Sequence, residues 1–158
     1  MSMSLIVDGF IRFFYNPIVT PTTLAYIASI IGKIIYESIT KRKLSLIAGV
    51  KDGGMPSSHT AAVVGLSTSI LLNEGLSTVF WVSLLFSFIV MKDAIGVRWE
   101  TGQQAKAINE ILKRLRMRQV LEEDLKELLG HTEAQVLGGF IVGVVFSYIG
   151  HVLFFGPI

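Results

Sequence analysis

The sequence predicts an all-α fold, a polytopic membrane helical bundle of about four spanning helices with cytoplasmic amphipathic helices. Hydrophobic residues make up 51% of the 158 residues and charged residues only 16%, and the mean hydropathy is +0.61. This balance is unusual for a soluble domain. Several apolar stretches approach the ~20 residues that a membrane-crossing helix needs. Most basic residues lie in two segments between these stretches.

The predicted spanning helices together form a single integral membrane domain over residues 1–158. They cover residues 18–39, 59–73, 76–92 and 134–155. The second stretch is short, so it either stands nearly upright or begins inside the membrane from a re-entrant loop. Residues 1–14 are interpreted as an interfacial helix. Asp8 within the first apolar run, with no small-residue cleavage site, argues against a removable signal peptide.

The distribution of basic residues predicts the orientation. Four of the fourteen Lys and Arg residues lie between the first two stretches, and eight lie from Lys92 to Lys126. The positive-inside rule therefore predicts that the loops 40–58 and 93–133 are cytoplasmic and that both termini lie outside. The net charge of +2 indicates no nucleic-acid partner. The absence of cysteine excludes disulfides and thiolate chemistry.

The long second loop shows helical spacing of apolar residues, which predicts two amphipathic helices. The first set is Ile108, Ile111, Leu112 and Leu115, and the second is Leu121, Leu125, Leu128 and Leu129. Gly130 follows the second set, where a left-handed residue commonly ends a helix.

The first polar cluster joins a flexible loop to the start of the second apolar stretch. It contains Lys51, Gly53, Gly54, Ser57, Ser58 and His59. Paired glycines let the backbone approach a ligand, and the free N–H groups at a helix start favour an anion such as phosphate. The alternative interpretation is a glycine turn followed by serines that only cap the helix. His59 at the mouth of a membrane helix is harder to explain structurally, because polar groups there are costly.

The second polar cluster, at the end of the third stretch, contains Lys92, Asp93 and Arg98. In one interpretation Asp93 forms a structural ion pair with Lys92 or Arg98. In the other, the Arg98 guanidinium binds phosphate oxygens while Asp93 orients it or a neighbouring histidine. Both interpretations remain open at the level of sequence.

Histidine also stands at the start of the last apolar stretch, as His131. With His59 it provides two imidazoles on one predicted side of the membrane, one available as a nucleophile and one as a general acid. This division of roles suits phosphoryl transfer. His151 lies late in the last stretch and is interpreted as structural. Three scattered histidines without a close carboxylate pair give no compact metal-ligand spacing, so no metal is expected.

Three ordered motifs resemble those of the divergent type 2 phosphatidic acid phosphatase family, over about residues 15–156. They read GGMPSSHTAAV, KDAIGVRWETGQQAKAINEIL and LKELLGHTEAQVLGG. Members of this family are described as related to acid phosphatases and vanadium-dependent haloperoxidases. The string Pro56-Ser57-Ser58-His59 resembles the superfamily's Pro-Ser-Gly-His, which implies His59 as the acid that protonates the leaving group. The run from His131 to Gly138 resembles its last motif, which implies His131 as the nucleophile that forms a phosphohistidine.

The sequence departs from the superfamily pattern at three places. Gln135 stands where an aspartate normally orients the nucleophilic histidine, and Leu125 stands where a motif arginine is expected. The superfamily's motif Lys-x6-Arg-Pro is missing, although Lys51 is available as a phosphate ligand and Arg98 as a substitute arginine. Glu133 or Asp93 is the candidate to compensate for the charge that Gln135 lacks. A lost histidine–carboxylate pair costs orders of magnitude in rate.

Three functions are compatible with these residues. The resemblance implies a membrane-embedded hydrolase that cleaves a phosphorylated lipid through a phosphohistidine intermediate, without a cofactor. The second is a phospholipid- or anion-binding or transport protein that retains the phosphate pocket, in which Lys33 and the glycines 138, 139 and 143 form a polar pathway or close helix packing. The third is a structural partner whose segment 103–129 docks on anionic lipid or protein. The sequence leaves a homo-oligomer open.

Overall fold

The structure is a computed structural model that describes residues 9, 15–50, 53–115, 125 and 130–157. Within these ranges the regular structure is helical, so the predicted all-α fold is confirmed. The elements are α2 (Val19–Lys41), the 3-10 helix η1 (Leu46–Val50), α3 (Ser58–Glu74), α4 (Thr78–Ile95), α5 (Val97–Arg114) and α6 (Glu133–Phe155). Helices α2, α3, α4 and α6 match the four predicted stretches to within three residues at each end.

Three helical segments are long and apolar enough to cross a membrane. They are α2, the run Thr78–Arg114 that contains α4 and α5, and α6. Helix α3 has 17 residues, which corresponds to about 25 Å at 1.5 Å per residue. It is therefore the shortest of the four bundle helices, as the short second apolar stretch predicted.

Local sequence explains where the bundle helices begin. Ser57 and Ser77 cap α3 and α4, because each hydroxyl accepts a hydrogen bond from the backbone N–H three residues later. Thr132 caps α6 within a capping box, in which the side chain of Gln135 accepts a hydrogen bond from the N–H of Thr132. These short polar residues satisfy backbone donors that lipid cannot satisfy.

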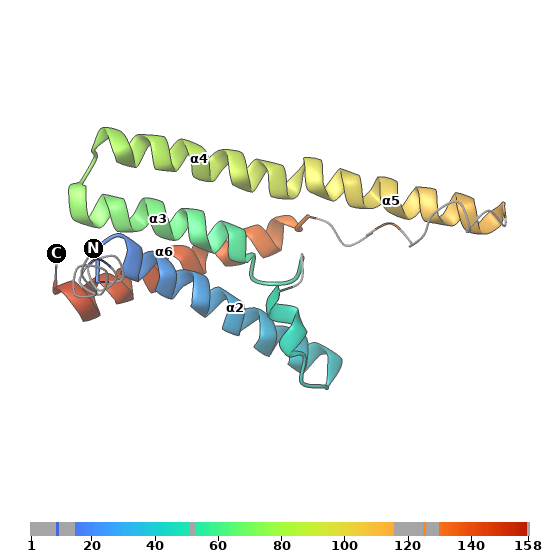
Figure 1. Ribbon diagram of the computed structural model, residues 1–158, viewed down its shortest axis with the longest axis horizontal. Coiled ribbons are helices and arrows are strands. Elements are labelled where there is room, and N and C mark those ends of the chain that lie inside the picture. Colours follow the sequence, from blue (N-terminus) through green and yellow to red (C-terminus); the bar gives the residue numbers. More distant parts are fainter. Residues whose placement is uncertain (1–8, 10–14, 51–52, 116–124, 126–129, 158) are drawn as a thin grey trace.

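Helix α3 lies at the centre of the bundle, packed against α2, α4 and α6 (Figure 1). Small residues on α6 permit the closest approach. A Cβ atom at Gly143 would lie 2.9 Å from Cβ of Val64, and one at Gly139 would overlap the Ser57 carbonyl oxygen. The packing interpretation of these two glycines is therefore the one that the structure supports.

Buried serines add hydrogen bonds between the helices. The hydroxyls of Ser67 on α3 and Ser87 on α4 lie 2.9 Å apart, and Ser147 on α6 donates to the Gly65 carbonyl of α3 at 3.1 Å. In lipid such bonds contribute about 0.6 kcal/mol each on average. Tight small-residue contacts and serine pairs together fix the neighbours of α3.

The direction of the helices determines where the polar loops meet. Helices α2 and α4 end at the same end of the bundle at which α3 and α6 begin, and we call this the site end (Figure 1). The start of α2, the end of α6 and the turn between α3 and α4 lie at the opposite end. The predicted loops 40–58 and 93–133 thus share one end.

Helix α5 continues the direction of α4 after Gly96 and extends beyond the bundle (Figure 1). It covers the first predicted amphipathic pattern. The second pattern, the helix end predicted before Gly130 and the interfacial helix predicted for residues 1–14 lie almost wholly outside the described residues. Leu125 is described, and its backbone N–H and carbonyl both pair with the side chain of Asn109 on α5.

Candidate active site at the site end of the bundle

His131 is fixed at the junction between α4 and α6. Its side chain is buried, and its backbone N–H donates to the carbonyl of Ala94, the penultimate residue of α4, at 2.9 Å. Thr132 follows directly as the cap of α6. The nucleophile candidate therefore stands on an anchored helix start and not on a free loop.

Gln135 holds the His131 imidazole from the first turn of α6. Its Oε1 lies 3.1 Å from Nδ1 of His131, and the same oxygen accepts the Thr132 N–H at 3.2 Å. Because an amide oxygen is only an acceptor, Nδ1 carries the proton and Nε2 keeps its lone pair. Gln135 thus occupies the orienting position that its place in the motif implies, without supplying a charge.

His59 faces His131 from the first turn of α3. The two ring centroids lie 6.4 Å apart, with an interplanar angle of 60°. A backbone hydrogen bond from Ser57 to the carbonyl of Gln135, at 3.0 Å, joins the starts of α3 and α6. His59 is exposed whereas His131 is buried, so one imidazole stands at the mouth of the site and the other at its base.

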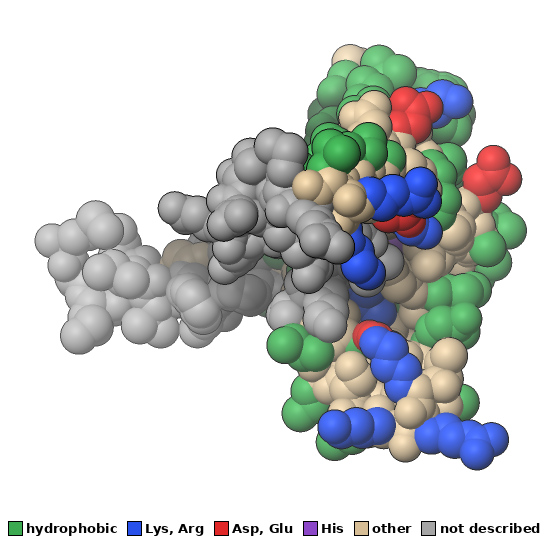
Figure 2. Space-filling model, turned by 90° about the vertical axis from the view of Figure 1, so that its right-hand side faces the viewer, with side chains coloured by type: hydrophobic (Ala, Val, Ile, Leu, Met, Phe, Trp, Pro, Cys, Tyr) green, Lys and Arg blue, Asp and Glu red, His purple; other side chains and the backbone are tan. Residues whose placement is uncertain are grey.

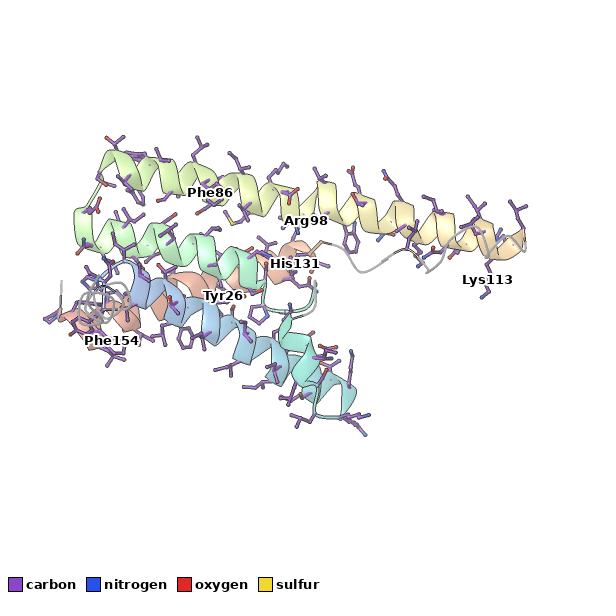
Figure 3. All side chains as sticks on the ribbon, viewed as in Figure 1. Tyr26, Phe86, Arg98, Lys113, His131 and Phe154 are labelled. Atoms are coloured by element: carbon purple, nitrogen blue, oxygen red, sulfur yellow. The ribbon has the colours of Figure 1, made fainter. Side chains whose placement is uncertain are left out.

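A cavity of about 40 Å³ lies between these histidines and α4. It is lined by Gly53, His59, Val90, Asp93, Ala94, Arg98, Gly130 and His131. The lining residues come from both predicted polar clusters and from the start of the last apolar stretch. Figure 3 shows Arg98 and His131 close together at this end, far from Phe154.

Asp93 and Arg98 form an ion pair across the junction of α4 and α5, with Nε of Arg98 donating to Oδ2 of Asp93 at 2.6 Å. Both side chains are exposed, 55% for Arg98 and 40% for Asp93, so the pair adds at most about 1 kcal/mol of stability. A guanidinium has five N–H donors, and this pair uses the one on Nε. The four N–H donors on the two Nη atoms are not used by this pair, and they belong to a side chain that lines the cavity.

The loop before α3 combines glycine turns with a helix cap. Gly53 and Gly54 have φ values of +77° and +87°, a region that favours glycine. Gly53 lines the cavity. The buried Ser57 hydroxyl accepts from the N–H and the hydroxyl of Thr60 at 3.4 and 3.0 Å, so its capping role is the one observed. Ser58 is buried in the first turn of α3.

Lys33 of α2 lies beside the site, although it does not line the cavity. It was interpreted as part of a polar pathway, but its side chain is 3% exposed and packs beneath Gly54, where a Cβ would lie 2.8 Å from Cε of Lys33. Its charge also acts on His131. A lysine inside an apolar helix is costly, and that cost was the available signal for a site residue.

The surroundings of His131 favour its neutral form. Burial lowers its pKa below the ordinary value of 6.5, the hydrogen bond to Gln135 opposes this change, and the positive charges of Lys33 and His59 lower the pKa further. A hydrogen bond to the Gly54 backbone acts in the raising direction. Since burial is the largest cause, the ring is a neutral imidazole at physiological pH.

Among the described residues predicted to take part, the ones that do not line this cavity are Gly54, Ser57, Ser58, Glu133 and Gln135. Glu133 is exposed in the first turn of α6 and does not line the cavity. The backbone of Leu125 pairs with the side chain of Asn109. Asn109 lies eleven residues after Arg98, which is about 16 Å along α5, so Leu125 lies away from the cavity. Lys51 lies outside the described residues. Among the described residues, no group of three His, Cys, Asp or Glu side chains is placed to hold a metal ion.

Basic side chains are scattered over the face of the molecule at this end of the bundle (Figure 2). The exposed ones at the ends of α2 and α4, at the start of α5 and along α5 include Lys41, Arg42, Lys43, Lys92, Arg98, Lys106, Lys113 and Arg114. Such a surface attracts anionic groups at a membrane interface.

The sequence matches the profile of the Divergent PAP2 family over residues 14–146. It is 37% identical over 130 residues to YuiD of Bacillus subtilis (strain 168), described as an uncharacterized membrane protein, with 74% of this chain and 82% of the relative covered. No solved structure matches the chain. Apolar helices of spanning length and a membrane-protein relative make this chain a membrane protein, and the family match shows that it belongs to the Divergent PAP2 family.

Proposed function

We propose that this protein hydrolyses the phosphomonoester of a membrane lipid, with His131 as nucleophile and His59 as general acid. The observation that carries the proposal is the convergence of these two histidines, from two separate helix starts, on one cavity that Arg98 also lines. Neither histidine is needed there for helix capping, because Ser57 and Thr132 serve as the caps.

In the proposed reaction, Nε2 of His131 attacks phosphorus and the bond to the leaving alkoxide breaks. His59 donates a proton to that oxygen, so an alcohol departs. Water then attacks the phosphohistidine, and its proton returns to His59 as phosphate is released. The neutral His131 ring supplies the lone pair that the attack needs.

Charged groups around the cavity are suited to the phosphate oxygens. The Nη donors of Arg98 match a phosphate bidentately, and Asp93 fixes the guanidinium through its Nε. Lys33 adds a buried positive charge on the α2 side, and the backbone of the loop before α3 adds N–H donors. No metal or organic cofactor takes part in the proposed reaction.

We place the site end in the cytoplasm. The two loops that reach this end carry most of the basic residues of the chain, and such loops are retained on the cytoplasmic side. The substrate is then a phosphorylated lipid of the inner leaflet.

A second candidate is a phospholipid-binding or transport protein with little turnover. The observation that favours it is the neutral Gln135 beside His131, since an amide cannot neutralise the positive charge that the His131 ring gains when its Nε2 bonds to phosphorus. Such a protein would bind the same ligands.

Phosphate release from a panel of phosphorylated lipids by the detergent-purified protein tests the proposal. We expect turnover by the unaltered protein and strong loss with His59→Ala and His131→Ala. Inert unaltered protein that still binds the lipids would select the second candidate. Turnover that survives His131→Ala would contradict the assigned nucleophile.

A further inference from the structure

We call the cavity between the two histidines and α4 the phosphate cavity. A second hollow opens beside it, on the flank of the bundle between α2 and α4. Its volume is about 630 Å³, within the ~300–1,000 Å³ typical of ligand pockets. Its floor is α3, through Ala62 and Val63, and its walls include Tyr26 and Ile30 of α2 and Phe86 and Ile89 of α4. We call this hollow the lateral groove.

The groove exists because α2 and α4 pack on α3 but do not contact each other. Figure 3 places Tyr26 on α2 and Phe86 on α4, with α3 between these helices. Tyr26, Phe86 and Ile89 are 43%, 51% and 59% exposed, as expected for residues on an open rim. The small side chain of Ala62 leaves depth in the floor.

The groove and the phosphate cavity are continuous. His59, Val90, Asp93 and Arg98 line both, so the polar end of the groove is the entrance to the site. From Asp93 back to Phe86 the groove follows α4 for about 10 Å, one third of a hydrocarbon core of about 30 Å. An amphiphile aligned with α4 would place its charged head at Arg98 and the adjoining part of its chain on apolar side chains.

We infer that the lateral groove binds the first part of the hydrocarbon chain of the phosphorylated substrate and delivers its phosphate to His131 from the side of the bilayer. This inference rests on the proposed function, because the phosphate cavity defines the polar end. Moving a chain from lipid into the groove gains little hydrophobic free energy, since lipid is equally apolar. The groove therefore acts by positioning the phosphate, and this type of contact affects rate strongly.

The experiment compares butyl phosphate and hexadecyl phosphate as substrates of the full protein in detergent. We expect a higher kcat/KM for hexadecyl phosphate. Val63→Phe fills the floor of the groove. We expect it to reduce the ratio of kcat/KM for hexadecyl phosphate to kcat/KM for butyl phosphate by about a hundredfold, because misplacement of a reacting group by 1 Å can cost that much in rate. The matched control is Val82→Phe, on a residue of α4 that is 63% exposed and lines neither hollow. It should change the ratio by no more than about twofold.

A truncation pair protects the test against misfolding of Val63→Phe. Phe86 and Phe88 are both exposed on α4, but only Phe86 lines the groove. We expect Phe86→Ala to lower the same ratio and Phe88→Ala to preserve it. Equal ratios for both variants would overturn the inference.

Photolabelling tests whether the groove binds the hydrocarbon chain, independently of whether the protein hydrolyses the phosphomonoester. Hexadecyl phosphate with a diazirine in the first half of its chain should label residues near Tyr26 and Phe86, and Val63→Phe should abolish this labelling. If the protein releases no phosphate from either substrate, the proposed function fails, and labelling alone decides the groove. Labelling spread evenly over the exposed faces of α4 and α6 overturns the groove even if the protein is a phosphatase.

Discussion

One buried histidine lies just before the start of α6 and another near its end, and their surroundings differ. His131 lies beside Gln135, faces His59 and lines a cavity with Arg98. His151 packs near the ring of Phe155, with centroids 6.1 Å apart, and its Nδ1 has no hydrogen-bond partner among the described residues. The two buried histidines thus differ because several elements bring donors, acceptors and space to His131 and not to His151.

Substitution of the two histidines tests this comparison most directly. We expect His131→Ala to lower phosphate release by about 10⁴-fold or more, because it removes the nucleophile. His151→Ala should stay within about twofold, since the residue lies at the opposite end of the bundle. Initial rates for matched amounts of folded protein measure both. Equal losses would contradict a catalytic role that belongs to His131 and not to His151.

A carboxylate at position 135 should sharpen the difference between the two ends. Gln135→Glu keeps the side-chain length and places a negative charge beside Nδ1 of His131, where it stabilises the imidazolium. Because loss of such a carboxylate costs about 10⁴-fold in a serine protease, we expect its gain to raise turnover about tenfold or more. The control is Gln104→Glu on the exposed face of α5. A rate unchanged by Gln135→Glu would show that a charge beside Nδ1 of His131 does not limit turnover.

Two neighbouring glycines of α6 differ in how closely they pack against the rest of the bundle. A Cβ at Gly139 would overlap the Ser57 carbonyl and lie 2.9 Å from Cβ of Thr60, whereas one at Gly138 would meet Met55 at 3.4 Å. We expect Gly139→Ala to reduce the free energy of unfolding by about 1–3 kcal/mol. Gly138→Ala should be neutral or slightly stabilising, because alanine favours a helix. Thermal unfolding in detergent measures both, and equal melting temperatures would contradict the close contact of α3 with α6.

The pH dependence should give the smallest effect, about tenfold per pH unit on the acid side. Burial lowers the pKa of His131, so its neutral form persists below pH 6.5, and activity should fall only as the pH drops through the lowered pKa. The unfolded chain binds this proton more readily, so stability also falls from pH 6.5 downward toward that pKa. The decline of kcat/KM at low pH measures the pKa of His131 in the free enzyme. Gln135→Glu should move this decline to higher pH, and an unmoved decline would assign it to a group other than His131.

Part of the site could be predicted from the sequence because it depends on local signals. His59 lies just after the cap of α3 and His131 just before the cap of α6, and the sequence predicts both at helix starts. Asp93 and Arg98, five residues apart, were expected to pair or to bind phosphate, and the structure shows the pair. Glu133 was expected to compensate for Gln135, yet it is exposed outside the cavity. Gln135 itself makes the orienting hydrogen bond, because His131 lies directly before the cap of α6 and Gln135, four residues later, lies in its first turn.

Sequence alone determined the helices, their approximate ends and the common end of the two basic loops, because apolar length, capping residues and charge distribution are local properties. Only the tertiary structure decided that α3 and α6 are neighbours, which brings His59 to 6.4 Å from His131. It also placed Lys33 beneath Gly54 and left α2 and α4 apart over the lateral groove. The physical reason is that contacts between helices depend on shape, here on small residues such as Gly139 and Gly143, which hydropathy does not encode.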